Sequence, residues 1–526
     1  MKMSSRNNDR VVSSNDSLMI CGSLTSQTVE QIVSDMYQAK AQGADLVEVR
    51  LDYISNLDRH NDLQTIISNK PLPVLLVYRP KQEGGLLDGD DKMRLEVLLQ
   101  AVGLGADFVE IELKAASGFM TKVEHKRYHK SKGKIIVSCY VDGITPPEEE
   151  LLQNVALMQA TGADIIKLIT RAADITEISR ILSLLPNCQV PLIAYSVGER
   201  GLISQLLCPK FGGFFVYGSL AGNPIPGLPS LDHLLEAYKL EHVNADTKIF
   251  GLISKPVGHS KGPILHNPSF RHVNYNRIYV PMFIDDLKEF FGTYSSPDFA
   301  GFSVGIPYKE EVTRFCDEVH PLAQSIGAVN TIIRRPKDGK LVGYNTDCEA
   351  SITAIEDALI EHGCNDGGAS SSLAGRLFVL IGAGGAGKAL AFGARSRGAR
   401  VVIFDIDFDK AKSLACAVCG EAQPYKDLIN FKPEKGAILA NATPIGMHPN
   451  TDRISVAEAT LSDYRLVFDA VYTPRRTRLL KEAEAAGAKT VSGVEMFLRQ
   501  AAAQFNLFTG LEAPEEFMRE IVLSKF

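Results

Sequence analysis

Eight short apolar runs recur between residues 18 and 240, and segments with helical spacing of apolar residues lie between them. The runs are LMICGSL (18–24), DLVEVRLD (45–52), PVLLVYRP (73–80), DFVEIEL (107–113), KIIVSCYV (134–141), DIIKLIT (164–170), VPLIAYSV (190–197) and GFFVYGSL (213–220). Apolar strands that alternate with helices form parallel sheets, because the crossover helices cover the sheet. Eight such units in roughly 220 residues predict a (β/α)8 barrel, whose chemistry lies at the C-terminal ends of the strands.

The overall composition limits what kind of protein this chain can be. Its 526 residues suggest roughly two to four domains. A net charge of −6 disfavours a general nucleic-acid binder, which normally has a basic excess, and no apolar run is long enough to cross a bilayer. Cys416 and Cys419 form the only CxxC, without a second pair or a nearby His, so we expect two buried helical residues and no metal site.

The segment RLFVLIGAGGAGKALAFGARSRGARVVIFDID (376–407) is the strongest local signal in the chain. An apolar strand runs into a glycine-rich turn, then into an Ala-rich helix and a second apolar strand. Glycines in such a turn let the backbone approach a pyrophosphate, and the helix N-terminus supplies N–H groups. This context predicts dinucleotide binding; the alternative is a tight turn that only packs the helix on the strand. The glycines concerned are Gly382, Gly384, Gly385 and Gly387.

Two acidic residues, Asp405 and Asp407, stand at the end of the second strand of this segment. A carboxylate about 20 positions after the glycines typically accepts hydrogen bonds from ribose hydroxyls, and it would repel a 2′-phosphate. No Arg or Lys occurs between Phe404 and Asp409. We therefore expect NAD rather than NADP as the cofactor. The alternative is a pair of solvent-exposed acids at a strand end.

Seven motifs follow one another in the second half of the chain. They are SKPVGHSKGPILHN (254–267), GIPYKE (305–310), GAVNTI (327–332), GYNTD (343–347), GAGGAGKAL (382–390), NATPIGM (441–447) and SGVEMFLRQA (492–501). Together they resemble shikimate dehydrogenase, and the N-terminal barrel resembles a type I 3-dehydroquinate dehydratase. Nearly everything after residue 18 is thus similar to the plant family of fused 3-dehydroquinate dehydratase/shikimate dehydrogenases.

The resemblance and the sequence pattern together suggest a division of the chain. The first residues are polar and lack the apolar core of a secretory signal, so we expect a disordered tail. The predicted parts are the tail (1–17), the dehydratase-like barrel (18–240), a linker (241–248), a substrate-binding catalytic domain (249–350) completed by C-terminal helices (495–526), and a Rossmann domain for NAD (351–494).

The resemblance implies that Lys309 and Asp347 form the catalytic pair. Oxidation of a secondary alcohol needs a group that takes the hydroxyl proton while hydride leaves for nicotinamide, and a lysine can serve if burial lowers its pKa. A surface ion pair is the alternative for Lys309. The other contacts implied are Ser260 and Tyr472 for the substrate carboxylate, Asn330 and Gln500 for ring hydroxyls, and Thr443 and Met496 for the cofactor.

Two residues near the expected carboxylate end depart from the family pattern. Gly262 stands where the family has a Ser, and Gly305 stands where it has a Thr. Each change removes a hydroxyl and opens volume around C1 of the substrate. Shikimate has a flat, unsaturated C1, whereas quinate has a tetrahedral C1 with an additional hydroxyl, so we expect room for quinate. For Gly305 the alternative is a backbone angle with φ > 0.

The barrel departs from its family in the catalytic residues. Lys167 matches the lysine that forms an imine with the substrate ketone. Tyr140 takes the place of the proton-shuttling His, and tyrosine, with an ordinary pKa of about 10, is a poor base at neutral pH. Gln205 replaces an Arg that binds the substrate. We expect a folded barrel with little or no dehydratase activity, in which Lys167 forms an adduct slowly or is only a core lysine. The residues that still match are Glu48, Arg50 and Arg79.

The preferred interpretation is an NAD-dependent quinate dehydrogenase that interconverts quinate and 3-dehydroquinate, fused to a degenerate barrel. The first alternative is a bifunctional dehydratase/shikimate dehydrogenase of the shikimate pathway that uses NADP. The second is a non-catalytic protein that binds a quinate-like ligand. We expect a monomer with a small-molecule substrate, neither nucleic acid nor membrane as partner, and a cytoplasmic location, with the plastid as the open alternative.

Overall fold

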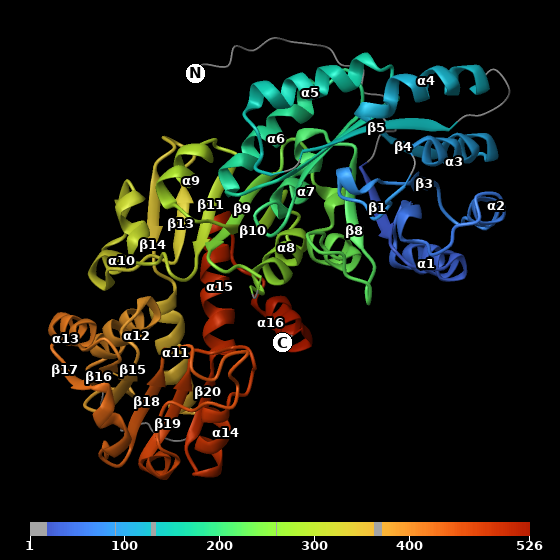
Figure 1. The fold of residues 1–526 in the computed structure, drawn as a ribbon. Coiled ribbons are helices and arrows are strands. Elements are labelled where there is room, and N and C mark those ends of the chain that lie inside the picture. Colours follow the sequence, from blue (N-terminus) through green and yellow to red (C-terminus); the bar gives the residue numbers. More distant parts are fainter. Residues whose placement is uncertain are drawn as a thin grey trace. The chain divides into compact units, whose positions relative to one another are not determined.

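The computed structural model describes residues 18–89, 91–127, 133–141, 143–258, 260–361 and 371–525. The chain forms two compact units (Figure 1). The first unit comprises Met1–Thr247 and Met282–Tyr294, and the second comprises Lys248–Pro281 and Ser295–Phe526. The tail expected at 1–17 lies outside the described residues.

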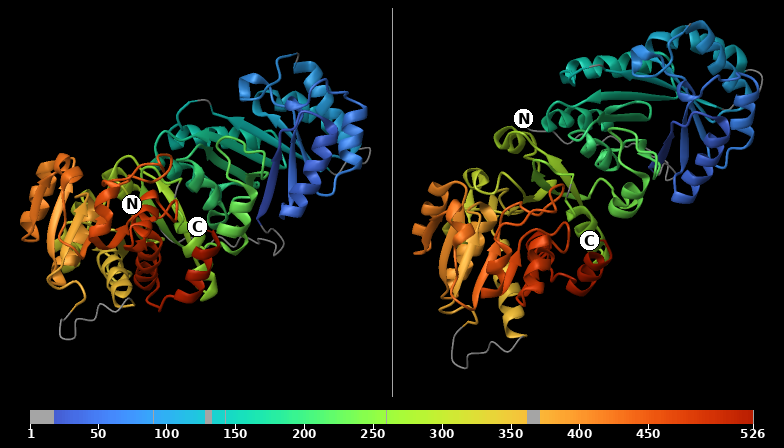
Figure 2. Two further views of the ribbon diagram at one scale, coloured as in Figure 1. Left: turned by 90° about the horizontal axis from the view of Figure 1, so that it is seen from below. Right: turned by 60° about the horizontal axis from the view of Figure 1, so that its bottom comes forward.

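The first unit is built on eight parallel strands in the order β7-β6-β5-β4-β3-β2-β1-β8. Figures 1 and 2 show this sheet and its helices in blue to green. The backbone N–H of Phe214, just before β8, donates to the carbonyl of Leu192 in β7 over 3.1 Å, so the two ends of the sheet meet. Every predicted strand is present, and the predicted barrel is confirmed. The strands are β1 (Met19–Leu24), β2 (Leu46–Arg50), β3 (Val74–Val77), β4 (Phe108–Glu112), β5 (Lys134–Tyr140), β6 (Ile165–Arg171), β7 (Leu192–Val197) and β8 (Phe215–Ser219).

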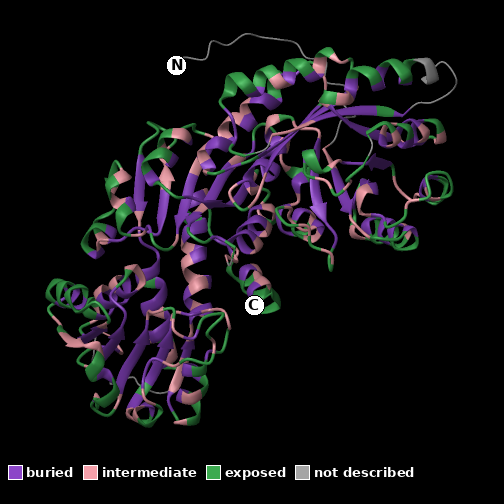
Figure 3. Ribbon diagram, viewed as in Figure 1, coloured by how far each residue is buried: buried purple, intermediate pink, exposed green. Residues whose placement is uncertain are grey.

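Helices connect these strands and cover the outside of the sheet, so several strands are buried along their whole length (Figure 3). The first helix shows how the sequence sets its limits: the Thr28 hydroxyl accepts a hydrogen bond from the Gln31 N–H, and Gly43 ends the helix with φ +96°. The helices are α1 (Val29–Gln42), α2 (Asn61–Ser68), α3 (Asp91–Leu104), α4 (Leu113–Arg127), α5 (Glu148–Ala160), α6 (Ile178–Leu184), α7 (Leu202–Leu206) and, after β8, a π-helix (His233–Tyr238).

The segment Met282–Tyr294, which includes α9 (Leu287–Thr293), belongs to the first unit although the sequence places it in the substrate-binding domain. The Tyr294 hydroxyl donates to the carbonyl of Ile175 over 2.5 Å. Arg200 donates two hydrogen bonds to Asp285, at 2.6 and 2.9 Å. These contacts join residues far apart in sequence, and sequence spacing does not reveal them.

The second unit begins with a mixed six-stranded sheet in the order β10-β9-β11-β13-β14-β12. Strand β11 pairs with β9 in parallel and with β13 in antiparallel orientation, and this arrangement places the loop after β11 beside the end of β9. The elements are β9 (Lys248–Ser254), α8 (Gly262–His272), β10 (Arg277–Phe283), β11 (Phe299–Val304), β12 (Glu318–Val319), α10 (Pro321–Ile326), β13 (Thr331–Arg334) and β14 (Leu341–Tyr344).

A second sheet in this unit has six parallel strands in the order β17-β16-β15-β18-β19-β20, the doubly wound order of a Rossmann domain. Apolar cores lie on both of its faces, one containing Phe378 and the other Val379. The elements are α11 (Asp347–Ile360), β15 (Leu377–Ile381), α12 (Gly385–Ser396), β16 (Arg400–Asp405), α13 (Phe408–Ala417), β17 (Glu421–Pro424), β18 (Ala437–Asn441), β19 (Tyr464–Asp469), α14 (Arg478–Ala485) and β20 (Lys489–Ser492).

The last two helices, α15 (Gly493–Thr509) and α16 (Glu515–Lys525), return to the first sheet of this unit. Phe505 of α15 and Met518 of α16 share a buried cluster with Phe250 of β9. Met496, near the start of α15, belongs instead to the core of the Rossmann domain. One helix therefore contributes to the cores of both domains.

Candidate functional site

Lys309 and Asp347 meet in the second unit. Lys309 follows β11, and its carbonyl accepts a hydrogen bond from the Val329 N–H over 2.7 Å. Asp347 is the first residue of α11. The Lys309 Nζ donates to Asp347 Oδ2 over 2.6 Å, and the two side chains are 20% and 4% exposed. The lysine thus has a carboxylate partner and keeps part of its surface open to a small molecule.

Three polar residues in the loops beside this pair fix the backbone from which Asp347 projects. Asn345 Oδ1 accepts from the N–H groups of Asp347 and Cys348, both over 3.1 Å, and so caps the start of α11. Asn330, the expected ring-hydroxyl contact, donates to the Thr346 hydroxyl over 2.8 Å and accepts from the Thr346 N–H over 2.9 Å. Asn330 therefore also fixes the loop before Asp347. Asn345 and Thr346 belong to the GYNTD motif, which indicates a role for the Asp alone.

The glycine-rich turn packs directly on Lys309. A Cβ built on Gly385, the first residue of α12, would lie 3.1 Å from both Cβ and Cδ of Lys309. A larger residue would push the lysine stem away. The glycine at this position therefore brings the start of α12 against the Lys309–Asp347 pair.

The turn also has the shape that a pyrophosphate requires. Gly382 has φ +103°, and a Cβ on Gly387 would lie 1.9 Å from the Gly382 carbonyl oxygen, so these two glycines are needed for the turn itself. Gly384 has no atom within 4 Å of its Cβ position, so packing does not explain it. Open space at the N-terminus of a helix fits a dinucleotide phosphate.

The two acids after β16 differ in what they contact. Asp405 Oδ2 accepts from the Ala383 N–H of the glycine turn over 2.6 Å, and Asp405 Oδ1 accepts from the Asp407 N–H over 2.8 Å. Asp407 caps α13 by accepting from the Lys410 N–H over 3.2 Å. Between them, Ile406 is 85% exposed. Asp405 thus ties the turn to the strand, and Asp407 has a structural role at the helix start.

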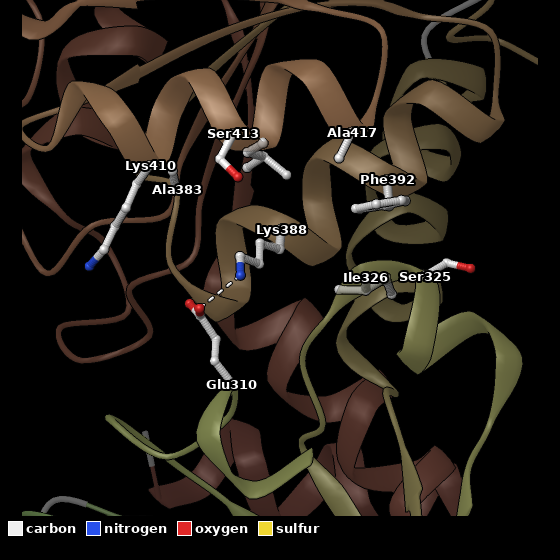
Figure 4. A pocket seen from close by; sticks show the side chains of 10 residues that line it. Glu310, Ser325, Ile326, Ala383, Lys388, Phe392, Lys410, Ser413 and Ala417 are labelled. Carbon is white, nitrogen blue, oxygen red and sulfur yellow. Dashed lines mark hydrogen bonds and ion pairs between the residues drawn. The ribbon is translucent and has the colours of Figure 1, made fainter. Parts of the chain in front are cut away.

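A hollow of about 250 Å³ lies beside the glycine turn (Figure 4). Lys388 of α12 enters it and pairs with Glu310 over 2.7 Å. Lys410 also lines the hollow, and its Nζ lies 4.0 Å from Asp407 Oδ2 (Figure 4). Two ammonium groups near the turn are therefore present, although the residues directly after β16 are not basic.

The remaining predicted contacts lie on several elements of the second unit. The Tyr472 ring packs on Phe497 with centroids 5.0 Å apart, and Gln500 donates to the Phe497 carbonyl over 3.1 Å. Burial raises the pKa of the Tyr472 hydroxyl. Ser260 Oγ accepts from the Gly262 N–H over 3.1 Å at the start of α8. Thr443 donates to Asn441 after β18 over 2.7 Å, and Met496 is buried in the Rossmann core.

The two glycines of the expected carboxylate end do not border empty space. A Cβ on Gly305 would lie 2.5 Å from Ser254 Oγ and 2.8 Å from Ser254 Cβ. A Cβ on Gly262 would lie 2.8 Å from Cε1 and 3.1 Å from Oη of the buried Tyr279. The expectation of free volume directly above these glycines is therefore wrong, because neighbouring strands fill it. Gly305 is not among the glycines with positive φ, so the backbone alternative is wrong as well.

The barrel lysine has a different environment from Lys309. Lys167 is fully buried, and its Nζ contacts Glu110 over 2.8 Å and Glu48 over 3.0 Å. It also lies 4.3 Å from the centroid of the Tyr217 ring. Burial alone would lower the pKa of Lys167, but the carboxylates of Glu110 and Glu48 outweigh burial and raise it above its ordinary value. Glu110, which no sequence motif indicates, lies buried on β4.

The other barrel candidates are also engaged within the protein. Arg79 donates to Glu110 over 2.9 Å, and Arg50 donates twice to Asp52, at 2.9 and 2.7 Å. The Gln205 Oε1 accepts from the Tyr217 N–H over 2.8 Å, while its buried Nε2 has no partner within the described residues. Each cation of this cluster already has a carboxylate. The Tyr140 ring packs 3.7 Å from the Cβ position of Gly84.

Cys416 and Cys419 are both exposed, so the expectation that they are buried is wrong. Cys416 is near the end of α13 and Cys419 follows the helix, where no core covers them. In the part of the chain that the structure describes, no three His, Cys, Asp or Glu side chains are grouped to hold a metal ion. None of the described helices is both long and apolar enough to span a membrane.

Comparisons with known proteins match the two halves of the chain. A type I 3-dehydroquinase model matches residues 20–245, a shikimate dehydrogenase substrate binding domain model matches 252–332, and a shikimate 5′-dehydrogenase C-terminal domain model matches 493–523. A chloroplastic bifunctional 3-dehydroquinate dehydratase/shikimate dehydrogenase of Arabidopsis thaliana is 49% identical over 97% of this chain and 84% of that protein.

Other similar proteins cover the second half alone. A shikimate dehydrogenase (NADP(+)) of Methanosarcina acetivorans is 38% identical over 52% of this chain and 98% of that protein. Among solved structures, a quinate dehydrogenase from Corynebacterium glutamicum in complex with NAD is 29% identical, with a TM-score of 0.46, and it covers 53% of this chain and 99% of that chain.

Proposed function

Because the chain belongs to the family of bifunctional 3-dehydroquinate dehydratase/shikimate dehydrogenases, we propose that it is an NAD-dependent quinate dehydrogenase whose barrel has little or no dehydratase activity. The observation that carries the dehydrogenase assignment is the Lys309–Asp347 pair, 2.6 Å apart, beneath the first glycine of α12. Lys309 takes the proton of the substrate hydroxyl, and Asp347 orients the resulting ammonium. A nicotinamide cofactor, when bound, supplies the hydride acceptor.

Two features support NAD. The residue at the end of β16 is Asp405, which fits ribose hydroxyls and repels a 2′-phosphate. The next side chain, Ile406, is 85% exposed and offers an apolar surface where a phosphate would need a cation. Gly384 leaves space at the helix start for the pyrophosphate. We therefore propose that Asp405 and Ile406 lie at the adenosine ribose of the cofactor and that the glycine turn binds its pyrophosphate.

The support for quinate comes from the C1 end of the site. Both side chains that the family resemblance places at the substrate carboxylate are absent at Gly262 and Gly305. Ser254 and Tyr279 close over these positions from neighbouring strands. A site rebuilt around C1 suits a substrate that differs at C1, and quinate differs from shikimate by its tetrahedral C1 and additional hydroxyl.

The support for a silent barrel is the state of Lys167. Imine formation needs a neutral amine, but two carboxylates hold Lys167 as an ammonium ion. Tyr140 stands where a general base is needed, and Gln205 cannot supply the charge of an arginine. We therefore expect no efficient dehydration of 3-dehydroquinate.

A second candidate is the bifunctional enzyme that uses NADP. The Arabidopsis relative carries that double name, and the Methanosarcina relative is named for NADP, so the names of the relatives favour this candidate. Lys388 and Lys410 near the glycine turn are the cations that could pair with a 2′-phosphate. Lys388 would then exchange its present partner Glu310 for the phosphate, and Lys410 lies 4.0 Å from Asp407. The experiment must therefore include both cofactors and both substrates.

The test is a set of initial-rate assays of quinate and shikimate, each with NAD and with NADP, together with the enone absorbance after addition of 3-dehydroquinate. We expect the highest kcat/KM for quinate with NAD and no enone above the background. Lys309→Met serves as the inactive control. Preferential oxidation of shikimate with NADP, or rapid enone formation, would replace this proposal by the second candidate.

A further inference from the structure

Ser254 and Gly305 share one place in the second unit. Ser254 is the last residue of β9, and Gly305 directly follows β11, which pairs with β9 through Ile253 and Val304. The Gly305 N–H donates to the Ile253 carbonyl over 2.9 Å, which fixes this register. A Cβ on Gly305 would overlap Ser254, at 2.5 Å from Oγ and 2.8 Å from Cβ. These two positions therefore cannot both carry ordinary side chains in this backbone.

The proton of the Ser254 hydroxyl is already committed. Ser254 Oγ lies 2.9 Å from the carbonyl oxygen of Ile306, and the side chain is buried. A carbonyl oxygen can only accept, so Ser254 must donate in this hydrogen bond. The hydroxyl oxygen keeps its lone pairs and can only accept from any further group. A ligand that meets Ser254 must therefore bring a donor.

We propose that Ser254 determines substrate specificity by accepting a hydrogen bond from the C1 hydroxyl of a quinate-type acid. This inference rests on the proposed function, because it assumes that the substrate carboxylate and C1 face Gly305, four residues before Lys309. A substrate with an unsaturated C1 has no hydroxyl there and leaves the Ser254 oxygen unpaired. A site that contains a buried polar group discriminates against the analogue that cannot pair with it.

The same geometry explains why position 305 is a glycine. A hydroxyl on residue 305 would rotate freely and could donate to a carboxylate, whereas the hydroxyl on Ser254 is oriented by Ile306. Because residue 305 has no side chain, the Ser254 side chain fits beside it. A hydroxyl donor on residue 305 is thus replaced by the Ser254 hydroxyl oxygen, which can only accept from the substrate. Ser254 and Gly305 thus depend on each other, and we expect a substitution at either position alone to lower stability or the preference for quinate.

The first test is the variant Ser254→Ala, assayed with quinate and shikimate in the full-length protein. Alanine keeps the Cβ, so the packing against Gly305 stays the same. We expect the ratio of kcat/KM for quinate over shikimate to fall roughly tenfold, the size of one neutral hydrogen bond. Ser269→Ala is the matched control, because Ser269 is a fully buried serine that donates to a backbone carbonyl, Leu265, over 2.7 Å. An equal fall for both substrates would overturn the acceptor role.

The second test compares thermal unfolding and substrate preference of Gly305→Thr with those of the double variant Ser254→Gly/Gly305→Thr. We expect the single variant to melt several degrees lower because of the overlap, and the double variant to recover and to prefer shikimate. A single variant as stable as the unmodified protein would overturn the shared-place argument. If the unmodified protein does not oxidise quinate at all, the proposed function fails and the acceptor role fails with it, whereas the melting comparison still judges the size pairing.

Discussion

Each unit of the molecule holds a lysine against acid side chains, but the two lysines differ in how firmly they are bound. Lys167 is fully buried between Glu48 and Glu110, and Arg79 occupies the other oxygen of Glu110. Lys309 has one carboxylate, Asp347, and is 20% exposed. A lysine that exchanges a proton with a ligand must be accessible to that ligand, and few carboxylates can surround it, because each one stabilises the ammonium form. By this criterion Lys309 is suited to catalysis and Lys167 to holding the barrel together.

The largest effect should come from Lys309→Met. Loss of the proton acceptor should lower kcat/KM for the alcohol by about 10²–10⁴-fold, the usual contribution of a general base. The melting temperature should also fall, because the buried carboxylate of Asp347 loses its cation, so activity is compared at a temperature at which the variant is folded. Lys248→Met is the control for loss of a lysine–aspartate pair at a more exposed place in the same unit, because Lys248 pairs with Asp298 over 2.7 Å. If both variants oxidised the substrate equally well, Lys309 would be no more than an ion-pair residue.

Lys167→Met should have the opposite consequence. Removal of one partner from a buried ionic cluster leaves Glu48 and part of Glu110 uncompensated and should destabilise the first unit by about 3–5 kcal/mol. Chemical denaturation measures this loss, and dehydrogenase activity at low temperature measures the effect on the second unit. A loss below about 1 kcal/mol would contradict the view that Lys167 holds the barrel together.

The two units should also differ in their response to mild acid. Burial lowers the pKa of His266 in the second unit to about 4, and its Nδ1 has no partner among the described residues. The unfolded chain binds a proton at this His below pH 6.5, whereas the folded chain does not until about pH 4, so stability falls as the pH drops between these values. The loss from His266 alone should be on the order of 2–3 kcal/mol. Asp469 of the same unit offsets part of this loss, because burial raises its pKa to about 6 and the folded chain therefore binds that proton before the unfolded chain does.

The first unit should resist the same change, because Lys167 and Arg79 overcome burial and lower the pKa of Glu110 to about 2. The stability that ionised Glu110 contributes to the folded state is present above pH 4.5 and is lost only as the pH falls towards 2. Calorimetry at pH 7 and pH 5 can separate the two units. His266→Phe should remove the destabilising contribution of this His to the second unit, and His272→Phe, at an exposed position on the same helix, should leave that contribution in place. Greater acid sensitivity of the first unit would disagree with this assignment.

The smallest effect is expected from Glu110→Gln, which leaves Lys167 with one carboxylate, as Lys309 has. The pKa of Lys167 should fall, so that its amine slowly forms an imine with 3-dehydroquinate. Borohydride reduces this imine to a stable adduct, which mass spectrometry should detect. The unmodified protein should show no such adduct at Lys167. Equal labelling of both proteins would mean that the carboxylate pair does not suppress the amine.

The sequence predicts the two architectures because they depend on local periodicity and on the glycine turn. The strands of the barrel and of the Rossmann sheet follow from short apolar runs, and the Lys309–Asp347 contact follows from ordered motifs. The neighbours of Gly305 and Lys167 do not follow, because they depend on strand register. Ser254 faces Gly305 only because Ile253 pairs with Val304, and Glu110 meets Lys167 only inside the closed barrel.

Helix α15 has a consequence for how this polypeptide is made. Its start packs in the Rossmann core through Met496, and its later turns complete the other core through Phe505. Strand β9, which emerges from the ribosome more than 200 residues earlier in the order of the sequence, cannot bury Phe250 fully until that helix has been synthesised. The first unit has no such requirement from α15, so most of it can mature during translation while the dehydrogenase half waits for the final helices.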